Sequence, residues 1–121
     1  MTPSARRLIE ALLAARNAGS TDQTRALLAP DARYWDCLGG QVRGAEPVAG
    51  ALLASHTGSA QPRFVAETLA AAGGHAVMEV RVCHGAGSEA SGYPATEVYE
   101  LRGGLVAGCR AYLDPADVRA E

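Results

Sequence analysis

The sequence contains no lysine, and all 11 of its basic residues are arginines. This excludes enzymes that form a Schiff base through a lysine amine, and nucleotide-binding P-loops, which need a lysine for the phosphates. The sequence also lacks any apolar run near the ~20 residues that a membrane-spanning helix requires. Its net charge of -2 shows no basic excess, so we expect neither nucleic acid nor a membrane as a partner.

Cysteine and histidine are scarce, with three of each. Cys37, Cys83 and Cys109 form no CxxC pair, and the histidines lack HxH or HxxxH spacing, so no metal site is expected and no cofactor is implied. Widely spaced cysteines indicate reduced thiols in a cytoplasmic protein. GxSxG and GxGxxG motifs are also absent, which argues against a serine hydrolase and a dinucleotide-binding protein.

The remaining composition is that of an ordinary globular protein. The chain has 121 residues, of which 48% are hydrophobic and 20% are charged. This length fits one domain over residues 1–121, with enough apolar surface for a core of its own.

Helical patterns occupy the first half of the chain. Leu8 and Leu12 begin an apolar stripe at i, i+4 spacing, and Pro30 is expected to close a second short helix. The expected helices cover residues 3–18, 20–28 and 44–58.

Strand formers dominate from residue 32 onwards. Glycine pairs at 39–40, 73–74 and 103–104 indicate tight hairpin turns. The expected strands cover residues 32–37, 41–43, 63–71, 75–84, 93–102 and 105–113. Pro115 stops the last strand, and a short polar tail follows.

This order of elements predicts an α+β fold with three N-terminal helices packed on a strongly curved antiparallel sheet. Such a sheet, wrapped around a long helix, encloses a conical hollow. A hollow of this kind is a natural site for a small molecule.

Four segments resemble the NTF2-like, or SnoaL-like, superfamily: NAG at 17–19, PDARYWD at 30–36, VRGAEP at 42–47 and TEVYELRGGLV at 96–106. The resemblance covers nearly the whole chain and implies the cone fold. It also implies a small apolar ligand and a homodimer formed through the outer sheet face, where Glu79, Arg81 and Cys83 form one row. The superfamily includes ketosteroid isomerases, polyketide cyclases, scytalone dehydratase and limonene epoxide hydrolase, so the fold alone does not name the reaction.

The sequence is most similar to the ketosteroid isomerase pattern. The resemblance places Asp36 at the general base of that enzyme and Glu97 at the acid that donates to the oxyanion. Leu12 stands where that pattern has an essential tyrosine.

Strand alternation predicts which of these side chains share a face. Tyr34 and Asp36 point to one face, and Trp35 and Cys37 to the other. If the Tyr34 face lines the cone, Asp36 lies in an apolar pocket suited to general-base work. Alternatively, Asp36 caps the turn at Gly39–Gly40 through its side chain.

Glu97 shares a strand face with Tyr99. A second acid in the cone could donate a proton or assist the base. The alternative is an exposed sheet carboxylate paired with an arginine. Arg110 is a candidate for orienting a carboxylate or for holding Glu97 ionised, and its alternative is an exposed cross-strand ion pair.

The other candidates come from neighbouring positions. His84 ends an apolar strand face and could act as an acid, a base or a hydrogen-bond donor. The candidate catalytic residues are Asp36, Glu97 and His84, and the candidate substrate-binding residues are Leu12, Tyr34, Met78, Val80, Tyr99, Arg110 and Tyr112.

The sequence therefore predicts a cofactor-independent acid–base enzyme of the isomerase, cyclase or dehydratase type. Its substrate would be a small apolar molecule with a carbonyl group, such as a steroid or a polyketide, because each reaction begins with proton removal next to a carbonyl. Two alternatives remain at this point. One is a non-catalytic ligand-binding or dimerisation module, and the other is an enzyme that opens an epoxide.

Overall fold

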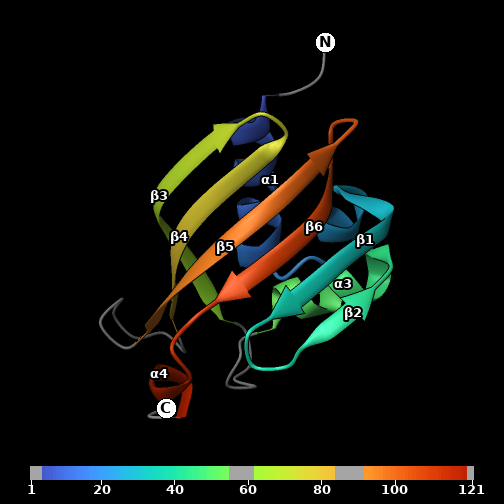
Figure 1. The fold of residues 1–121 in the computed structure, drawn as a ribbon. Helices are drawn as coiled ribbons and strands as arrows, with labels where there is room; N and C mark the ends of the chain where they lie inside the picture. The colour runs from blue at the N-terminus through green and yellow to red at the C-terminus, as the bar shows by residue number, and fades with distance from the viewer. Residues whose placement is uncertain (1–3, 55–61, 84–91, 120–121) are drawn as a thin grey trace.

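A computed structural model describes residues 4–54, 62–83 and 92–119. Its centre is one curved six-stranded sheet in the order β2-β1-β6-β5-β4-β3 (Figure 1). The strands are β1 (Leu28–Asp36), β2 (Gln41–Arg43), β3 (Arg63–Ala72), β4 (His75–Cys83), β5 (Tyr93–Arg102) and β6 (Leu105–Tyr112). No helix in these ranges is long and apolar enough to cross a membrane.

Helices cover one face of this sheet. They are α1 (Ala5–Asn17), α2 (Thr21–Ala26) and α3 (Ala45–Leu53). The short α4 (Pro115–Arg119) follows β6 and lies beyond the end of the sheet (Figure 1). Ser4 and Ser20 cap the first two, since each side-chain oxygen accepts a backbone N–H of the first turn. Helix α1 packs on β3 and β4, and α3 packs on β1, so Figure 1 shows both behind the sheet.

The core lies between these helices and the concave face of the sheet. Apolar residues of α1 and α3 meet the inward side chains of the strands, which alternate with outward ones as expected. The α+β cone predicted from the sequence is confirmed. Both long hairpins also turn at their glycine pairs, where Gly73, Gly74, Gly103 and Gly104 all have positive φ angles.

The pairing of β1 differs from the prediction. Strand β1 lies parallel to β6, whereas the sequence favoured a wholly antiparallel sheet. The short β1–β2 hairpin thus joins the main sheet through the last long strand. No local pattern distinguishes these pairings, because parallel partners are brought together by distant parts of the chain.

Pro30 does not close a helix but lies inside β1. Helix α2 ends at Ala26, and β1 begins at Leu28. The ladder between β1 and β6 is irregular between Leu28 and Arg33, and β2 pairs only with residues 33–35. Since Pro30 has no ladder partner, its missing N–H costs no strand hydrogen bond.

Two further boundaries differ from the prediction, and so does the exposure of Cys83. Helix α3 ends at Leu53, and its expected end at Gly58 lies outside the described residues. Pro115 opens the fourth helix, where a polar tail was expected, because proline suits a first helical turn. Cys83 is buried at the end of β4, where Val82 is also buried, so both sheet faces are covered there and Cys83 adds nothing to an outer surface.

Candidate functional site

Asp36 lies at the end of β1 with its carboxylate on the concave face of the sheet. It is 7% exposed, and Tyr34, which shares its face, is 6% exposed. The Tyr34 hydroxyl donates to Asp36 Oδ2 at 3.0 Å. This dyad brings together a buried carboxylate and a buried hydroxyl, as the alternation of β1 predicted.

The same carboxylate also holds the turn that follows. Asp36 Oδ1 accepts the backbone N–H groups of Leu38 and Gly40, each at 2.9 Å. A Cβ atom at position 40 would overlap the Asp36 carboxylate, so any other residue there would displace this side chain. Asp36 therefore caps the turn, as the alternative expected, and contacts Tyr34 at the same time. One oxygen serves the turn and the other faces Tyr34.

Glu97 forms a second buried polar group, with an arginine that the sequence analysis did not select. Two nitrogens of Arg16 donate to the two carboxylate oxygens of Glu97, at 2.7 and 2.9 Å. Arg16 Nε donates to the Leu52 carbonyl at 2.7 Å, so α1, α3 and β5 meet at one guanidinium. Arg16 and Glu97 are 3% and 2% exposed, so their desolvation is offset only because nearly every polar atom has a partner.

Tyr99 completes this group. Its hydroxyl donates to Glu97 Oε1 and accepts from Arg16 at 3.0 Å. The Arg16 guanidinium also lies over the Phe64 ring, 4.0 Å from the ring centre. Burial lowers the pKa of Arg16, but the attraction of Glu97 and Tyr99 outweighs it, and the pKa rises overall.

Tyr34 and Tyr99 stay protonated for a common reason. Burial, followed by the negative charge of Asp36, raises the pKa of Tyr34 well above its ordinary range, and Glu97 adds to the rise. Burial and Glu97 likewise raise the pKa of Tyr99, although Arg16 opposes them. Both hydroxyls are therefore hydrogen-bond donors at any ordinary pH.

Three predicted apolar contacts also lie in the interior. Leu12, Met78 and Val80 are buried in the same core. Met78 is the cross-strand partner of Glu97, and it lines a hollow of about 230 Å³ between α1 and the β3–β4 hairpin. This hollow therefore lies beside the strand position of Glu97.

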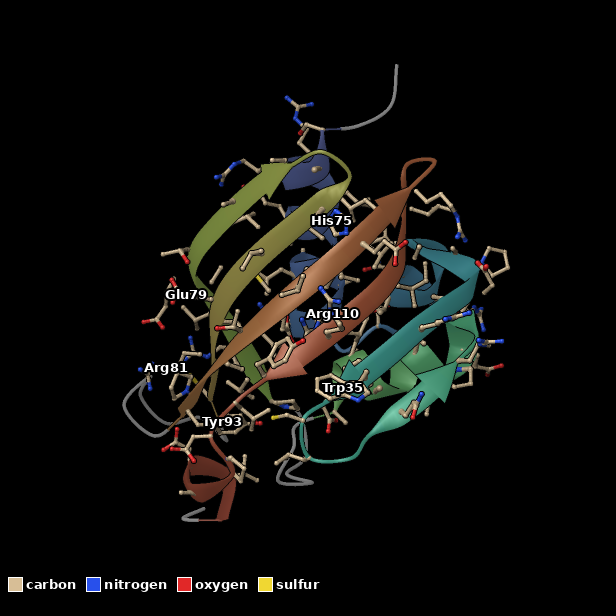
Figure 2. All side chains as sticks on the ribbon, viewed as in Figure 1. Trp35, His75, Glu79, Arg81, Tyr93 and Arg110 are labelled. Atoms are coloured by element: carbon tan, nitrogen blue, oxygen red, sulfur yellow. The ribbon has the colours of Figure 1, made fainter. Side chains whose placement is uncertain are left out.

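Two other candidates lie on the opposite face. Arg110 and Tyr112 are exposed, because they alternate with the buried residues Cys109 and Ala111 along β6. Neither faces the interior, and Arg16 takes the place beside Glu97 that the sequence analysis offered to Arg110. Figure 2 shows Arg110 on the sheet face away from α1. His84 lies outside the described residues.

Arg16 could have been found from helical spacing. It follows Leu8 and Leu12 at i+8 and i+4, so it belongs to the buried stripe of α1. An arginine at such a position is buried only with a partner, which points to an acid on the facing sheet. In the described ranges, no group of three or more histidine, cysteine, aspartate and glutamate side chains comes together to hold a metal.

A family model for the SnoaL-like domain matches residues 9–109, and the chain belongs to this family. Its fold is NTF2-like, as several solved structures show. An NTF2-like protein of unknown function from Cytophaga hutchinsonii ATCC 33406 has a TM-score of 0.78 and 15% identity, over 96% of this chain and 95% of that one. No curated protein matches the chain.

Two further structures are similar in fold. An LEH-like epoxide hydrolase from M. tuberculosis has a TM-score of 0.76 and 22% identity, covering 94% of this chain and 85% of that one. A protein with a ketosteroid isomerase-like fold from Catenulispora acidiphila DSM 44928, in complex with trimethylamine, has a TM-score of 0.78 and 21% identity, covering 99% and 92%. At these identities the likeness shows the fold alone, so the reaction has to be argued from the site.

Proposed function

We propose that this SnoaL-like protein is a cofactor-independent acid–base enzyme. Its substrate is a small apolar molecule with a carbonyl group, of the steroid or polyketide kind. The observation that carries the proposal is the dyad of Asp36 and Tyr34, in which a buried carboxylate meets a buried hydroxyl at 3.0 Å inside the cone.

In this proposal Asp36 removes a proton from the carbon next to the substrate carbonyl. Once the carboxylate has taken that proton, the Tyr34 hydroxyl is released to donate to the enolate oxygen. Tyr34 fits this role because its raised pKa keeps the proton on its oxygen. Asp36 then returns the proton to another carbon in an isomerisation. In a ring closure onto a second carbonyl it returns the proton to the new alkoxide, and in a dehydration to the departing hydroxyl, which leaves as water.

Glu97 has a different part from the one first expected. A bidentate guanidinium favours the ionised carboxylate, so Glu97 does not act as a proton donor in this proposal. It holds Arg16 and Tyr99 in place beneath the substrate. His84 keeps its predicted role as a further acid or base.

The test is a turnover assay with a panel of 3-oxo-Δ5 steroids, polyketide-like β-ketones and terpene epoxides. We expect Asp36→Asn to lower kcat by roughly 10²–10⁴-fold on the substrate that is turned over. Asparagine can still accept the two turn N–H groups, so the variant should fold. Tyr34→Phe should lower kcat by a smaller factor.

Asp31→Asn is the matched control, because Asp31 is an exposed carboxylate on the same strand, paired with Arg102. It should keep the wild-type kcat. Full activity in Asp36→Asn would show that the base has been assigned to the wrong residue. Turnover of the epoxide alone would move the proposal to epoxide opening, with Arg16 as the inward arginine beside Glu97.

A second candidate is a non-catalytic module that only binds a small ligand. Two observations favour it: the turn hydrogen bonds of Asp36, and Leu12 in place of the tyrosine that the isomerase pattern requires. This candidate predicts that a ligand raises the Tm of wild type and of Asp36→Asn equally, without turnover of any panel compound.

A further inference from the structure

The turn after β1, residues 37–40, is closed on itself and fixed to the end of β6. The Asp36 N–H donates to the Gly40 carbonyl at 2.9 Å, and the Gly39 N–H donates to the Asp36 carbonyl at 3.2 Å. The Cys37 thiol donates to the Leu113 carbonyl at 3.2 Å and accepts the Leu113 N–H at 3.4 Å. The turn therefore offers a fixed backbone on which the Asp36 side chain can rest.

The two glycines of this turn have different reasons to be glycine. Gly39 has a φ of 102°, a conformation that favours glycine. Gly40 does not have a positive φ, so its backbone conformation does not demand glycine. A Cβ atom on Gly40 would instead overlap Asp36 Oδ2 and lie 2.9 Å from Asp36 Cγ. Glycine at position 40 therefore makes room for the carboxylate.

The hydrogen bonds distinguish the two oxygens of that carboxylate. Oδ1 accepts the N–H groups of Leu38 and Gly40, each at 2.9 Å, which uses both of its lone pairs. Within the described residues, Oδ2 accepts the Tyr34 hydroxyl alone, at 3.0 Å. Oδ2 therefore keeps a lone pair that can take a proton, whereas Oδ1 is occupied by the turn.

Together these hydrogen bonds fix the orientation of the Asp36 side chain. A base held in this way needs no rearrangement before it reacts, and a displacement of about 1 Å can cost roughly 10²-fold in rate. The Tyr34 hydroxyl lies at the same oxygen that has the unused lone pair. The carbon that loses the proton and the oxygen that gains negative charge therefore both belong beside Oδ2.

We propose that Gly40 is a positioning residue for the proposed reaction. Because Gly40 has no Cβ atom, the Asp36 carboxylate lies on the turn, with Oδ1 held by the backbone and Oδ2 as the oxygen that removes the proton. Gly40 touches no reacting atom and acts through Asp36. This inference rests on the proposed function, to which it adds the basic oxygen and the residue that places it.

Gly40→Ala tests the proposal on whichever panel compound is turned over. We expect kcat to fall by about 10²-fold with little change in KM, because the carboxylate is displaced while the apolar contacts of the substrate stay. Gly50→Ala is the matched control, since Gly50 is exposed on α3 and a Cβ atom there meets open space. It should keep the wild-type kcat. Wild-type kcat in Gly40→Ala would overturn the proposal.

A second measurement needs no substrate. In NMR spectra of the full-length protein, the amide protons of Leu38 and of the residue at position 40 report on their hydrogen bonds to Asp36 Oδ1. Both resonances should move upfield in Gly40→Ala and stay in place in Gly50→Ala. Unchanged resonances in Gly40→Ala would show that the carboxylate has not moved, which would overturn the proposal even if no panel compound is turned over.

A double variant separates displacement of the carboxylate from strain in the turn itself. Gly40→Ala should lower the Tm of the wild-type protein, because Asp36 loses buried hydrogen bonds. In the Asp36→Ala background the overlapping carboxylate is gone, so Gly40→Ala should lower the Tm much less or not at all. An equal loss of Tm in both backgrounds would place the strain in the turn and overturn the proposal.

The kinetic results also separate this inference from the proposed function. Loss of kcat in Asp36→Asn together with wild-type kcat in Gly40→Ala would overturn the role of Gly40 and leave Asp36 as the base. Full activity in Asp36→Asn would overturn both, because Gly40 acts only through Asp36. Loss of kcat in both variants, with the expected amide shifts, would support both.

Discussion

Among single residues, Arg16 connects several parts of the interior through its hydrogen bonds. It joins a helix, a strand and a neighbouring carbonyl through a guanidinium that is 3% exposed. Removing one partner of such a pair leaves the other charge buried and uncompensated, which typically costs 3–5 kcal/mol. Arg16 therefore matters to the stability of the interior whether or not the cone is catalytic.

We predict that Arg16→Met lowers the free energy of unfolding by about 3 kcal/mol or more. Glu97→Leu should have a similar effect, and the double variant should be clearly less destabilised than the sum of the two, because the charges disappear together. Urea unfolding of the four proteins measures this coupling. Arg25→Met, which breaks the exposed pair with Asp22, should change stability by less than about 1 kcal/mol. If the losses of unfolding free energy in Arg16→Met and Glu97→Leu simply added in the double variant, Arg16 and Glu97 would not be a coupled buried pair.

The interior hydroxyls predict how stability depends on pH. Tyr34 has an ordinary pKa of 10.0, and its folded-state pKa is raised by burial and by Asp36. The unfolded chain therefore releases this proton first as pH rises above about 10, and stability falls there. Below that pH the stabilisation is fully present.

Tyr34→Phe should make the alkaline fall in unfolding free energy shallower by up to about 1.4 kcal/mol per pH unit. The slope is measured by urea unfolding at a series of pH values from neutral to about 11. The slope that remains comes in part from Tyr99 and Cys109, whose pKa values burial also raises. An unchanged slope would show that Tyr34 titrates normally in the folded protein.

The sequence predicted the faces of the single strands well, because a strand repeats every two residues. Tyr34 and Asp36 lie inside the cone, as do Glu97 and Tyr99. The partner of Glu97 was missed, since Arg16 lies 81 positions away and only tertiary contacts bring the two together. Arg110 was a reasonable candidate by charge, but its place in the alternation of β6 puts it on the outer face.

At the scale of elements, the end of α1 is tied to β3 by one side chain. The Asn17 amide donates to the Phe64 carbonyl at 2.8 Å and accepts the Phe64 N–H at 2.7 Å. A single amide thus replaces the two backbone groups that a neighbouring strand would offer. It also fixes the residue whose ring lies against Arg16.

We predict that Asn17→Ala lowers the free energy of unfolding by about 1–2 kcal/mol, because Phe64 loses both of its hydrogen bonds. Asn17→Asp should also destabilise, since its carboxylate cannot donate to the Phe64 carbonyl. Thermal or urea unfolding measures both. Gln23→Ala removes an exposed amide from α2 and serves as the control. If Asn17→Ala and Gln23→Ala were equally stable, the two hydrogen bonds between Asn17 and Phe64 would contribute nothing to stability.

Element boundaries were predictable where a local signal decided them. The glycine pairs 73–74 and 103–104 marked both long hairpins, and the expected start of the second helix at residue 20 lies next to the start of α2 at Thr21. Pro30 misled because proline usually ends a helix, whereas here it sits in an irregular part of β1. The parallel pairing of β1 with β6 left no trace in either segment, since it depends on how the whole sheet closes.

At the scale of the whole molecule, the two sheet faces carry different kinds of residue. The concave face holds the interior residues of the proposed reaction, and the convex face carries the exposed side chains of Trp35, Arg110 and Tyr112. Association of two copies through the convex face, which the family resemblance implies, stays a prediction. Sedimentation of the full-length protein tests this association, and a monomer at all concentrations would contradict it.

The parallel contact of β1 with β6 has a consequence for synthesis on the ribosome. Strand β1 is made early, but its long partner is the last strand to be made. The apolar face of α1 must wait as well, because β3 and β4, which cover it, follow later in the chain. A nascent chain halted before Leu105 therefore presents an open sheet edge and an uncovered core, which is the state that chaperones recognise.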